Sequence, residues 1–312
     1  MSVKKVIVHA PATSANMGPG YDSMAMALEL RDDITFELAG DGESQAITLS
    51  EDGSPSPEGL PTDRSNLAIR AFEAVFVEAG ERPPSVRVTT VNRIPIARGL
   101  GSSAAAIVAG VTAGGVIRGS EIDLQSRLNL AAKIEGHPDN TVACILGGVT
   151  VSSLVGSRVM WAKIPLQREL GALVAVPDFG VSTGIARNVL PQSVLHADAV
   201  FNVGRVALLV ASLCTGAYEN LRYATEDKLH QPYRSLLVPG MLDAIRSACD
   251  GGALGAYVSG AGPAILALMD SECDPEPIAQ AMAAAFDRSR VKVSDMMALS
   301  LSSTGAVWEV EE

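Results

Sequence analysis

The feature that most constrains this chain is a glycine-rich turn, Gly99-Leu-Gly-Ser-Ser103, which opens onto a run of small residues starting at Ala104. A strand-like segment at residues 86–91 precedes the turn, and the small residues predict a helix continuing toward Ile117. Glycines let a backbone approach a ligand closely, and a helix start directs free N–H groups at an anion. The turn is therefore either a phosphate-binding loop or an ordinary turn before a helix, and the isolated pattern favours the second interpretation. It matches neither the Walker loop nor the dinucleotide-binding pattern of glycines.

Three other loops carry side chains that could bind a ligand. Residues 11–22 follow a short expected strand at 6–8, and their glycines, prolines and polar side chains predict an irregular loop. Residues 135–140 interrupt a helical pattern at Pro138 and include Glu, His, Asp and Asn. Residues 260–263 form a Gly-Ala-Gly-Pro turn after an expected strand at 256–259. Each loop can also be a satisfied polar turn, so none of them alone indicates a function.

The rest of the chain predicts alternating helices and strands. Helical apolar spacing covers residues 66–79, 124–134 and 197–215. Strands are expected at 149–155, 159–164 and 172–176, and also at 34–38 and 46–49, which would pair around a turn at Asp41 and Gly42. Residues 51–63, rich in Pro, Gly and Ser, are expected to form a surface loop. A domain boundary is expected near residue 160.

Composition and charge narrow the class of protein. A chain of 312 residues with 47% hydrophobic content can bury the cores of two domains, and only 4% aromatic residues favour layered helices and sheets, α+β or α/β. The net charge of −11 opposes a nucleic-acid partner, although local N–H groups can still bind a nucleotide. The four cysteines show no Cys-x-x-Cys pairing. Since neither a secretory signal nor a membrane-spanning apolar run is expected, we predict a cytoplasmic protein with no membrane partner.

Taken together and in this order, the loops resemble the signature segments of the GHMP kinases. Residues 11–22 resemble the first motif of that superfamily, residues 99–105 its phosphate loop and residues 258–264 its third motif. Within the superfamily, residues 135–140, 182–191 and 227–234 are similar to the corresponding segments of the homoserine kinases. The resemblance covers nearly the whole chain.

This resemblance implies a fold and an activity. The fold would be an α+β two-domain GHMP kinase fold, with an N-terminal nucleotide-binding domain at residues 1–160 and a C-terminal ferredoxin-like domain at residues 161–312. The activity would be ATP-dependent phosphorylation of the side-chain hydroxyl of L-homoserine to O-phospho-L-homoserine, in threonine biosynthesis. ATP and Mg²⁺ would be required, the active site would lie between the domains, and a homodimer is expected because dimers are common among relatives.

The resemblance also implies roles for individual residues. Substrate binding would fall to Asn16, Asp22, His137, Thr183, Arg187, Arg234 and Gly260. ATP binding would fall to Asn66, Pro95, Ile96, Ala97, Arg98, Gly99, Leu100, Gly101, Ser102 and Ser103. The metal would be held by Ser102, Ser103 and Glu135. The catalytic group would comprise Asn16, His137, Asp139 and Asn140.

The residue types suit these roles. A zwitterionic amino acid needs both signs of charge, with guanidinium for its carboxylate and carboxylates or amides for its ammonium group. Without the resemblance, Arg187 and Arg234 would be interpreted as exposed surface residues. Some GHMP kinases place the metal-binding carboxylate one or two helical turns earlier, where this chain has Asn129. Phosphoryl transfer does not demand a strong base, so whether Asp139 deprotonates the substrate stays open, and His137 and Asn140 are alternative orienting groups.

Two other classes of function are compatible with the same loops. A mevalonate-pathway or sugar kinase would share the phosphate loop, although two arginines argue against a neutral sugar and leave mevalonate, a carboxylate, as the stronger competitor. A ligand-binding regulator with the same fold would lack catalysis, but the chain has no basic DNA-binding element.

Overall fold

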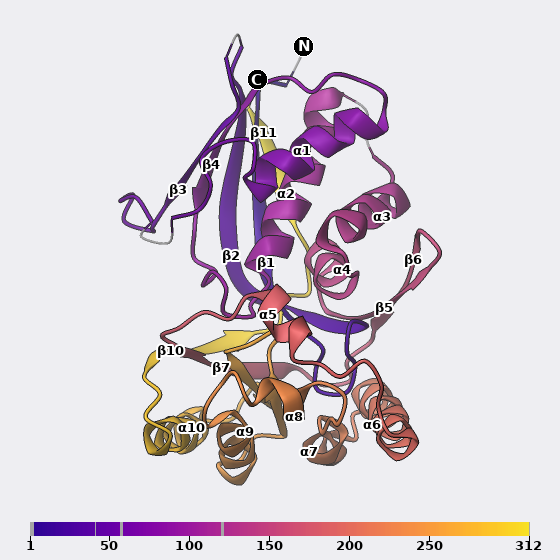
Figure 1. The fold of residues 1–312 in the computed structure, drawn as a ribbon, viewed down its shortest axis with the longest axis vertical. Coiled ribbons are helices and arrows are strands. Elements are labelled where there is room, and N and C mark those ends of the chain that lie inside the picture. Colours follow the sequence, from indigo (N-terminus) through magenta and orange to yellow (C-terminus); the bar gives the residue numbers. More distant parts are fainter. Residues whose placement is uncertain (1–2, 41, 57–58, 120–121, 312) are drawn as a thin grey trace.

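The computed structural model describes residues 3–40, 42–56, 59–119 and 122–311. It contains two β-sheets, one above the other in Figure 1, each with helices packed against it. The first sheet has the strand order β11-β1-β2-β4-β3, and β5 and β6 extend it from β2. Its strands are β1 (Lys5–Ala15), β2 (Met24–Leu38), β3 (Gln45–Leu49), β4 (Val86–Val91), β5 (Val149–Val155), β6 (Arg158–Ile164) and β11 (Val307–Glu311).

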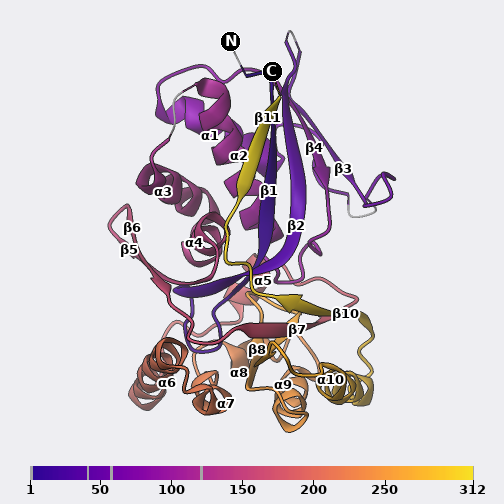
Figure 2. The ribbon, with the colours of Figure 1, turned by 180° about the vertical axis from the view of Figure 1, so that it is seen from behind.

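Helices lie on one face of the first sheet, and Figure 2 shows its strands from the other side. These helices are α1 (Leu67–Glu78), α2 (Ser102–Arg118), α3 (Leu124–Glu135) and α4 (Asp139–Leu146). Helix α1 begins where the Asn66 side chain accepts a hydrogen bond from the N–H of Ala68, at 3.0 Å. Helices α1 and α2 pack so closely that a Cβ added to Gly110 would lie 2.4 Å from the carbonyl oxygen of Ala68. The small residues of α2 therefore serve packing.

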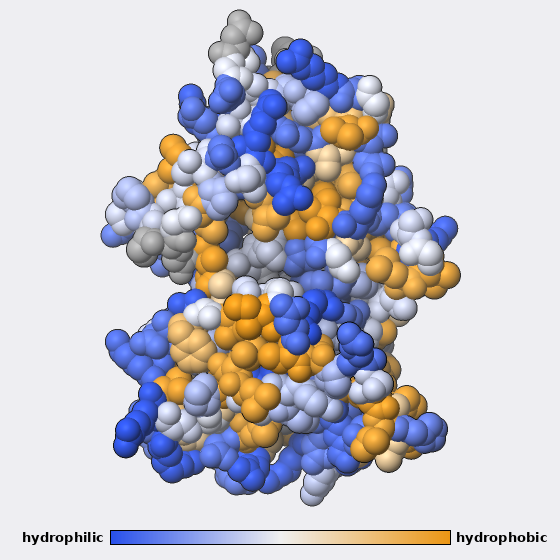
Figure 3. All heavy atoms as spheres, viewed as in Figure 1, coloured by the Kyte–Doolittle hydropathy of each residue, from blue (hydrophilic) through white to orange (hydrophobic). Residues whose placement is uncertain are grey.

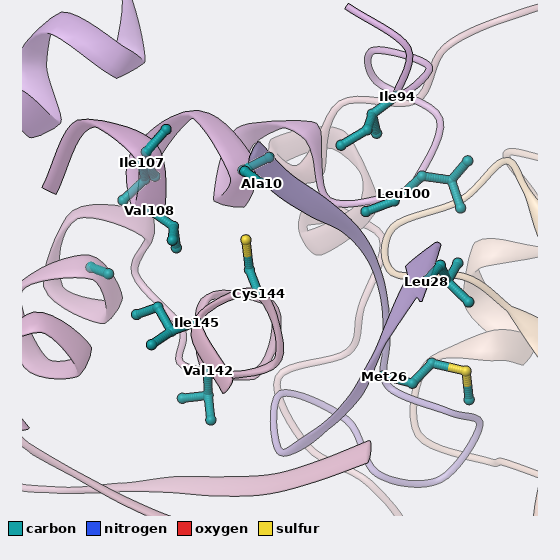
Figure 4. Close-up of a cluster of buried hydrophobic side chains, with 14 of the residues drawn as sticks. Ala10, Met26, Leu28, Ile94, Leu100, Ile107, Val108, Val142, Cys144 and Ile145 are labelled. Atoms are coloured by element: carbon teal, nitrogen blue, oxygen red, sulfur yellow. The ribbon is translucent and has the colours of Figure 1, made fainter. Parts of the chain in front are cut away.

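The core of this first layer fills the space between the sheet and the helices. Along β2, Ile34 and Phe36 are fully buried, whereas the alternate residues 33, 35 and 37 are partly exposed, as the two-residue period of a strand requires. Figure 4 shows side chains from β1, β2, α2 and α4 converging in this core. Cys144 is a buried free thiol among them.

The second sheet has the order β10-β7-β9-β8, and all its neighbouring strands are antiparallel. Its strands are β7 (Leu170–Pro177), β8 (Gly255–Val258), β9 (Ile265–Asp270) and β10 (Val293–Ser300). With α9 (Met241–Asp250) before β8 and α10 (Glu276–Arg288) before β10, the chain order is β-α-β-β-α-β, the ferredoxin-like arrangement. The predicted α+β fold with a ferredoxin-like second part is thus confirmed.

Five further helical elements lie between β7 and α9 along the chain. They are α5 (Thr183–Asn188), α6 (His196–Thr215), η1 (Tyr218–Asn220), α7 (Leu221–Ala224) and α8 (Gln231–Arg234). Two of them, α5 and α8, contribute residues to the cavity described below. The chain passes from the first sheet to the second between β6 and β7, and β11 returns to the first sheet beside β1. A division into domains at residues 1–160 and 161–312 stays a proposal.

Two predictions about strands were wrong. The strand expected at 6–8 continues to Ala15, because a register shift between Pro11 and Ala12 lets the chain keep pairing with β2 beyond the proline. The segments expected to pair around Asp41 and Gly42 do not pair with each other. Instead β3 runs parallel to β4, and β4 lies between it and β2. Asp41 itself lies outside the described residues.

The expectation that no apolar run is long enough to span a membrane was wrong for helix α6. By length and composition, this 20-residue helix could cross a membrane, and 22% of its apolar window is buried. It is attached to the rest of the chain by polar contacts. Asn202, which is 3% exposed, donates a hydrogen bond to the Asp227 carboxylate at 2.8 Å. Arg205 forms an ion pair with Glu226 at 2.8 Å.

Candidate active site

A cavity of about 400 Å³ lies between the two sheets, and Figure 3 shows the surface hollowed between the upper and lower parts of the molecule. Most of the residues predicted for substrate, nucleotide, metal and catalysis line it. They are Asn16, Asp22, Asn66, Ile96, Ala97, Gly99, Gly101, Ser102, Ser103, Glu135, His137, Asp139, Asn140, Thr183, Arg187, Arg234 and Gly260. The structure therefore brings four separate loops to one place.

The glycine-rich turn ends in the left-handed conformation that glycine favours. Gly101, with φ of +75°, is the N-cap of α2 and provides no side chain to bond the first N–H groups of the helix. A Cβ on Gly101 would lie 2.0 Å from the hydroxyl oxygen of Thr13, and a Cβ on Gly99 would lie 2.2 Å from the carbonyl oxygen of Ser259. Glycine is thus required by neighbouring chains as well as by φ, and the helix start faces the cavity with N–H groups available for an anion.

Two oxygen-bearing side chains meet at the start of α2. The hydroxyl of Ser103 donates a hydrogen bond of 2.5 Å to the carboxylate of Glu135, the last residue of α3. Burial raises the pKa of Glu135, an effect that outweighs the hydrogen bond from Ser103. Oxygen donors of this kind fit Mg²⁺. Asn129 does not line this cavity, and its oxygen accepts one hydrogen bond from Gln125 within α3 and one from the N–H of Val159, which attaches α3 to β6.

His137 and Asp139 form a pair beside this carboxylate. Nδ1 of His137 lies 2.6 Å from Oδ1 of Asp139, and its Nε2 lies 3.9 Å from Glu135. Burial lowers the pKa of His137, but the hydrogen bond and charge of Asp139 and the charge of Glu135 together raise it above its ordinary value. Asp139 also accepts the N–H of Asn140, whose side chain accepts a hydrogen bond from Thr13.

Asp22 and Arg187, both predicted to bind substrate, bind each other. Nη1 and Nη2 of Arg187 donate to the two carboxylate oxygens of Asp22 at 2.9 and 2.7 Å. The guanidinium also donates to the hydroxyl of Tyr21 at 3.1 Å and lies 5.6 Å from the centre of its ring. Asp22, His137 and Asp139 have oxygen or nitrogen atoms within 4.8 Å of one another, as a metal site would need. All five of these side chains are engaged by partners, but Ser103 and Glu135 lie at the start of α2, where the helix N–H groups can bind phosphate. They therefore remain the better candidates for a Mg²⁺ that contacts the nucleotide.

Arg234, the last residue of α8, lines the cavity and is only 2% exposed. Its Nη1 donates to the carbonyl of Gly260 at 2.6 Å, the same oxygen that accepts a hydrogen bond from Asn16 at 2.9 Å. Asn16, with φ of +71°, also accepts the N–H of Asp22. Its side chain therefore braces the loop between β1 and β2.

Three residues predicted for ATP do not line the cavity: Pro95, Arg98 and Leu100. Leu100 is fully buried in the core, and the guanidinium of Arg98 donates to backbone carbonyls of Ile96, Pro177 and Asp178. The sequence interpretation missed lining residues contributed by β2, β3 and β4. These are Asp32, Ile34, Thr48 and Thr90. No local motif marks them, because they meet only through the pairing of β2 with β4 and of β4 with β3.

Comparison with known proteins places this fold and site in a class. The family model of the GHMP kinases N terminal domain matches residues 66–148, and that of the GHMP kinases C terminal matches residues 209–288. Both include segments that line the cavity. The fold and the cavity are therefore those of a GHMP kinase.

Individual relatives narrow the assignment. The chain is 39% identical to a homoserine kinase of Caldicellulosiruptor saccharolyticus, with 96% of each chain covered. It is 42% identical to a homoserine kinase of Gloeobacter violaceus, with 88% of this chain and 91% of the relative covered. The crystal structure of a homoserine kinase from Cytophaga hutchinsonii superposes with a TM-score of 0.86 at 29% identity, covering 98% of both chains. The chain belongs to the homoserine kinase family.

Proposed function

We propose that this chain transfers the γ-phosphoryl group of ATP to the side-chain hydroxyl of L-homoserine, producing O-phospho-L-homoserine for threonine biosynthesis. One observation carries the proposal. A helix start that can bind phosphate and two arginines that can bind a carboxylate line the same cavity. The identity of 39% to 42% with homoserine kinases over most of the chain supports this choice of acceptor.

The reaction forms one bond and breaks one. The substrate hydroxyl oxygen attacks the γ-phosphorus in line, the bond from that phosphorus to the oxygen of ADP breaks, and the hydroxyl proton is released. The N–H groups at the start of α2 stabilise the negative charge on the transferring group. Mg²⁺, when bound by Ser102, Ser103 and Glu135, would neutralise phosphate charge. Most of the acceleration comes from positioning.

The side chains around the hydroxyl position it. Asp139 is engaged by the ring of His137 and by the N–H of Asn140, so it orients His137. In this mechanism His137 and Asn140 direct the substrate hydroxyl toward the phosphorus, and no strong base is required. At the other end of the substrate, Arg187 and Arg234 bind the carboxylate, while Asp22 and the Asn16 loop bind the ammonium group.

An assay of ADP release tests the proposal. L-homoserine, L-threonine, mevalonate and galactose are compared as acceptors in the presence of Mg²⁺ and ATP, and L-homoserine is expected to give the highest kcat/KM. A preference for mevalonate would replace the assigned substrate with another acceptor of the superfamily. ATP binding without ADP formation for every acceptor would instead indicate a regulator. We also propose a homodimer in the cytoplasm, and sedimentation velocity measures the oligomeric state.

A further inference from the structure

Arg234 has an unusual environment for a cation that is to bind a substrate carboxylate. Burial lowers the pKa of Arg234, and the nearby charge of Arg187 lowers it further. Its Nη1 donates to the carbonyl of Gly260 and lies 3.2 Å from Nδ1 of His230, while the guanidinium carbon lies 5.3 Å from the centre of the Tyr21 ring. Its Nε also donates to the carbonyl of Ala186 at 3.5 Å, so the orientation of the guanidinium depends on these four neighbours.

The protonation of His230 follows from its own two contacts. Its Nε2 lies 2.7 Å from the carbonyl oxygen of Gly18, which can only accept, so Nε2 carries the proton. Its Nδ1 faces Arg234, which can only donate, so Nδ1 must present a lone pair. Both contacts are satisfied only by the neutral ring with its proton on Nε2.

Burial keeps this ring neutral. His230 is fully buried, and burial lowers its pKa to about 4 even though the carboxylate of Asp227, 3.6 Å from Nε2, acts in the opposite direction. The carboxylate of Asp227 is itself occupied by the backbone N–H groups of residues 229, 230 and 231 and by the side chain of Asn202. These N–H bonds fix the turn that presents His230 and Arg234, four residues apart, on the same side.

We propose that His230 is a positioning residue for the substrate carboxylate: its neutral ring accepts a hydrogen bond from Arg234 and fixes the guanidinium facing the cavity. The inference rests on the proposed function. A histidine that merely fills the core would be replaceable by a ring of similar size, whereas this role requires a hydrogen-bond acceptor at Nδ1.

Steady-state kinetics of three variants test the inference. His230→Phe keeps an aromatic ring but lacks the acceptor, and it is expected to raise the KM for L-homoserine by about tenfold or more while the KM for ATP changes less than about twofold. His230→Gln offers an acceptor oxygen and a donor nitrogen, and it is expected to recover most of the lost affinity. His9→Phe is the matched control, since His9, on β1, bonds Asp33 of β2 and does not line the cavity, so this change should leave both KM values unchanged.

A double variant separates this role from general packing. If His230 acts through Arg234, then adding His230→Phe to Arg234→Lys should raise the KM for L-homoserine by less than about threefold. If the two side chains act independently, His230→Phe should raise the KM in the Arg234→Lys protein by the same factor as in the unaltered protein. Equal losses for L-homoserine and ATP, or full additivity in the double variant, would overturn the inference.

A spectroscopic measurement on the unaltered protein covers the case in which His230→Phe does not fold. Nitrogen NMR should show one of the four imidazoles as the neutral form protonated at Nε2 throughout the range of about pH 5 to pH 8. A spectrum in which all four rings titrate near their ordinary pKa would contradict the inference. Lack of L-homoserine turnover by the unaltered protein would instead refute the proposed function and leave the state of the His230 ring to the NMR result.

Discussion

At the scale of single residues, the groups expected to bind a zwitterion are already paired with each other across the cavity. Arg187 and Asp22 form a bidentate ion pair, and their side chains are 38% and 33% exposed. Because water screens a pair that is this exposed, a substrate can compete with it. The carboxylate of an amino acid can replace Asp22 as the partner of Arg187, and its ammonium group can replace Arg187 as the partner of Asp22. The pair therefore keeps both side chains in position before the substrate binds.

Arg187→Lys tests this arrangement. Lysine provides a single charge that cannot bond two carboxylate oxygens at once, so the KM for L-homoserine is expected to rise about tenfold while the KM for ATP stays within about twofold. Steady-state kinetics with each substrate varied in turn measure both values. Arg205→Lys, which alters a similar pair with Glu226 outside the cavity, is the control. A matching rise in the KM for ATP would contradict the assignment.

The buried carboxylate of Asp32 leads to a second prediction at the scale of residues. Asp32 is 3% exposed, and burial raises its pKa to about 6 although the N–H groups of Arg93 and Ile94 bond it. Because the folded pKa exceeds the unfolded value of about 3.9, the protonated form favours folding. The contribution of Asp32 to the free energy of unfolding is fully present below about pH 4 and is lost as the pH rises through about 6.

Asp32→Asn should therefore stabilise the protein at neutral pH, since the amide keeps an acceptor oxygen and carries no charge. The expected gain in the free energy of unfolding at pH 7 is on the order of 3 kcal/mol, vanishing near pH 4. Urea denaturation of both proteins at the two pH values measures the difference. A gain of equal size at both pH values would contradict the electrostatic explanation.

At the scale of elements, local signals predicted helices better than strand partners. The spacing of apolar residues predicted α1 almost to its ends, because a helical face is a property of residues close together in the sequence. The pairing of β3 with β4 could not be predicted, since the two strands are separated by α1 and nothing in either strand specifies its neighbour. The cavity-lining residues of β2, β3 and β4 were missed for the same reason.

The glycine turn before α2 gives a prediction about a single element. Gly101→Ala adds a Cβ 2.0 Å from Thr13 to a residue at φ +75°. Gly119→Ala, at φ +74° at the other end of α2, meets no atom of the described residues within 4 Å. Gly119→Ala is expected to cost about 1 kcal/mol of stability from backbone strain alone. Gly101→Ala should cost more and weaken ATP binding about tenfold or more.

Urea denaturation and ATP titration of the two alanine variants measure these effects. The comparison isolates the clash, because backbone conformation and substitution are the same at both positions. Equal stability loss and normal ATP affinity in both variants would show that the turn tolerates a side chain and does not bind phosphate.

At the scale of the whole molecule, the two layers are joined at the cavity itself. The N–H of Ala264 donates to the carbonyl of Arg98, the N–H of Val181 to that of Ala97, and the hydroxyl of Ser259 to that of Gly99. The phosphate turn of the first layer is therefore bonded to the second layer through three consecutive residues. The motifs predicted that these segments share a site, but no motif specifies bonds that form between backbones of distant segments.

A substitution of Arg98 tests whether this junction stabilises the fold or binds the nucleotide. Its guanidinium donates to the carbonyls of Ile96, Pro177 and Asp178, at 3.1, 3.1 and 3.4 Å, and so links the turn to the end of β7. Arg98→Ala leaves these carbonyls without that donor and is expected to lower the free energy of unfolding by about 2 kcal/mol. The Kd for ATP should change by less than about twofold, because the side chain does not line the cavity. Urea denaturation and ATP titration measure the two quantities, and a large loss of ATP affinity at unchanged stability would instead place the Arg98 side chain against the nucleotide.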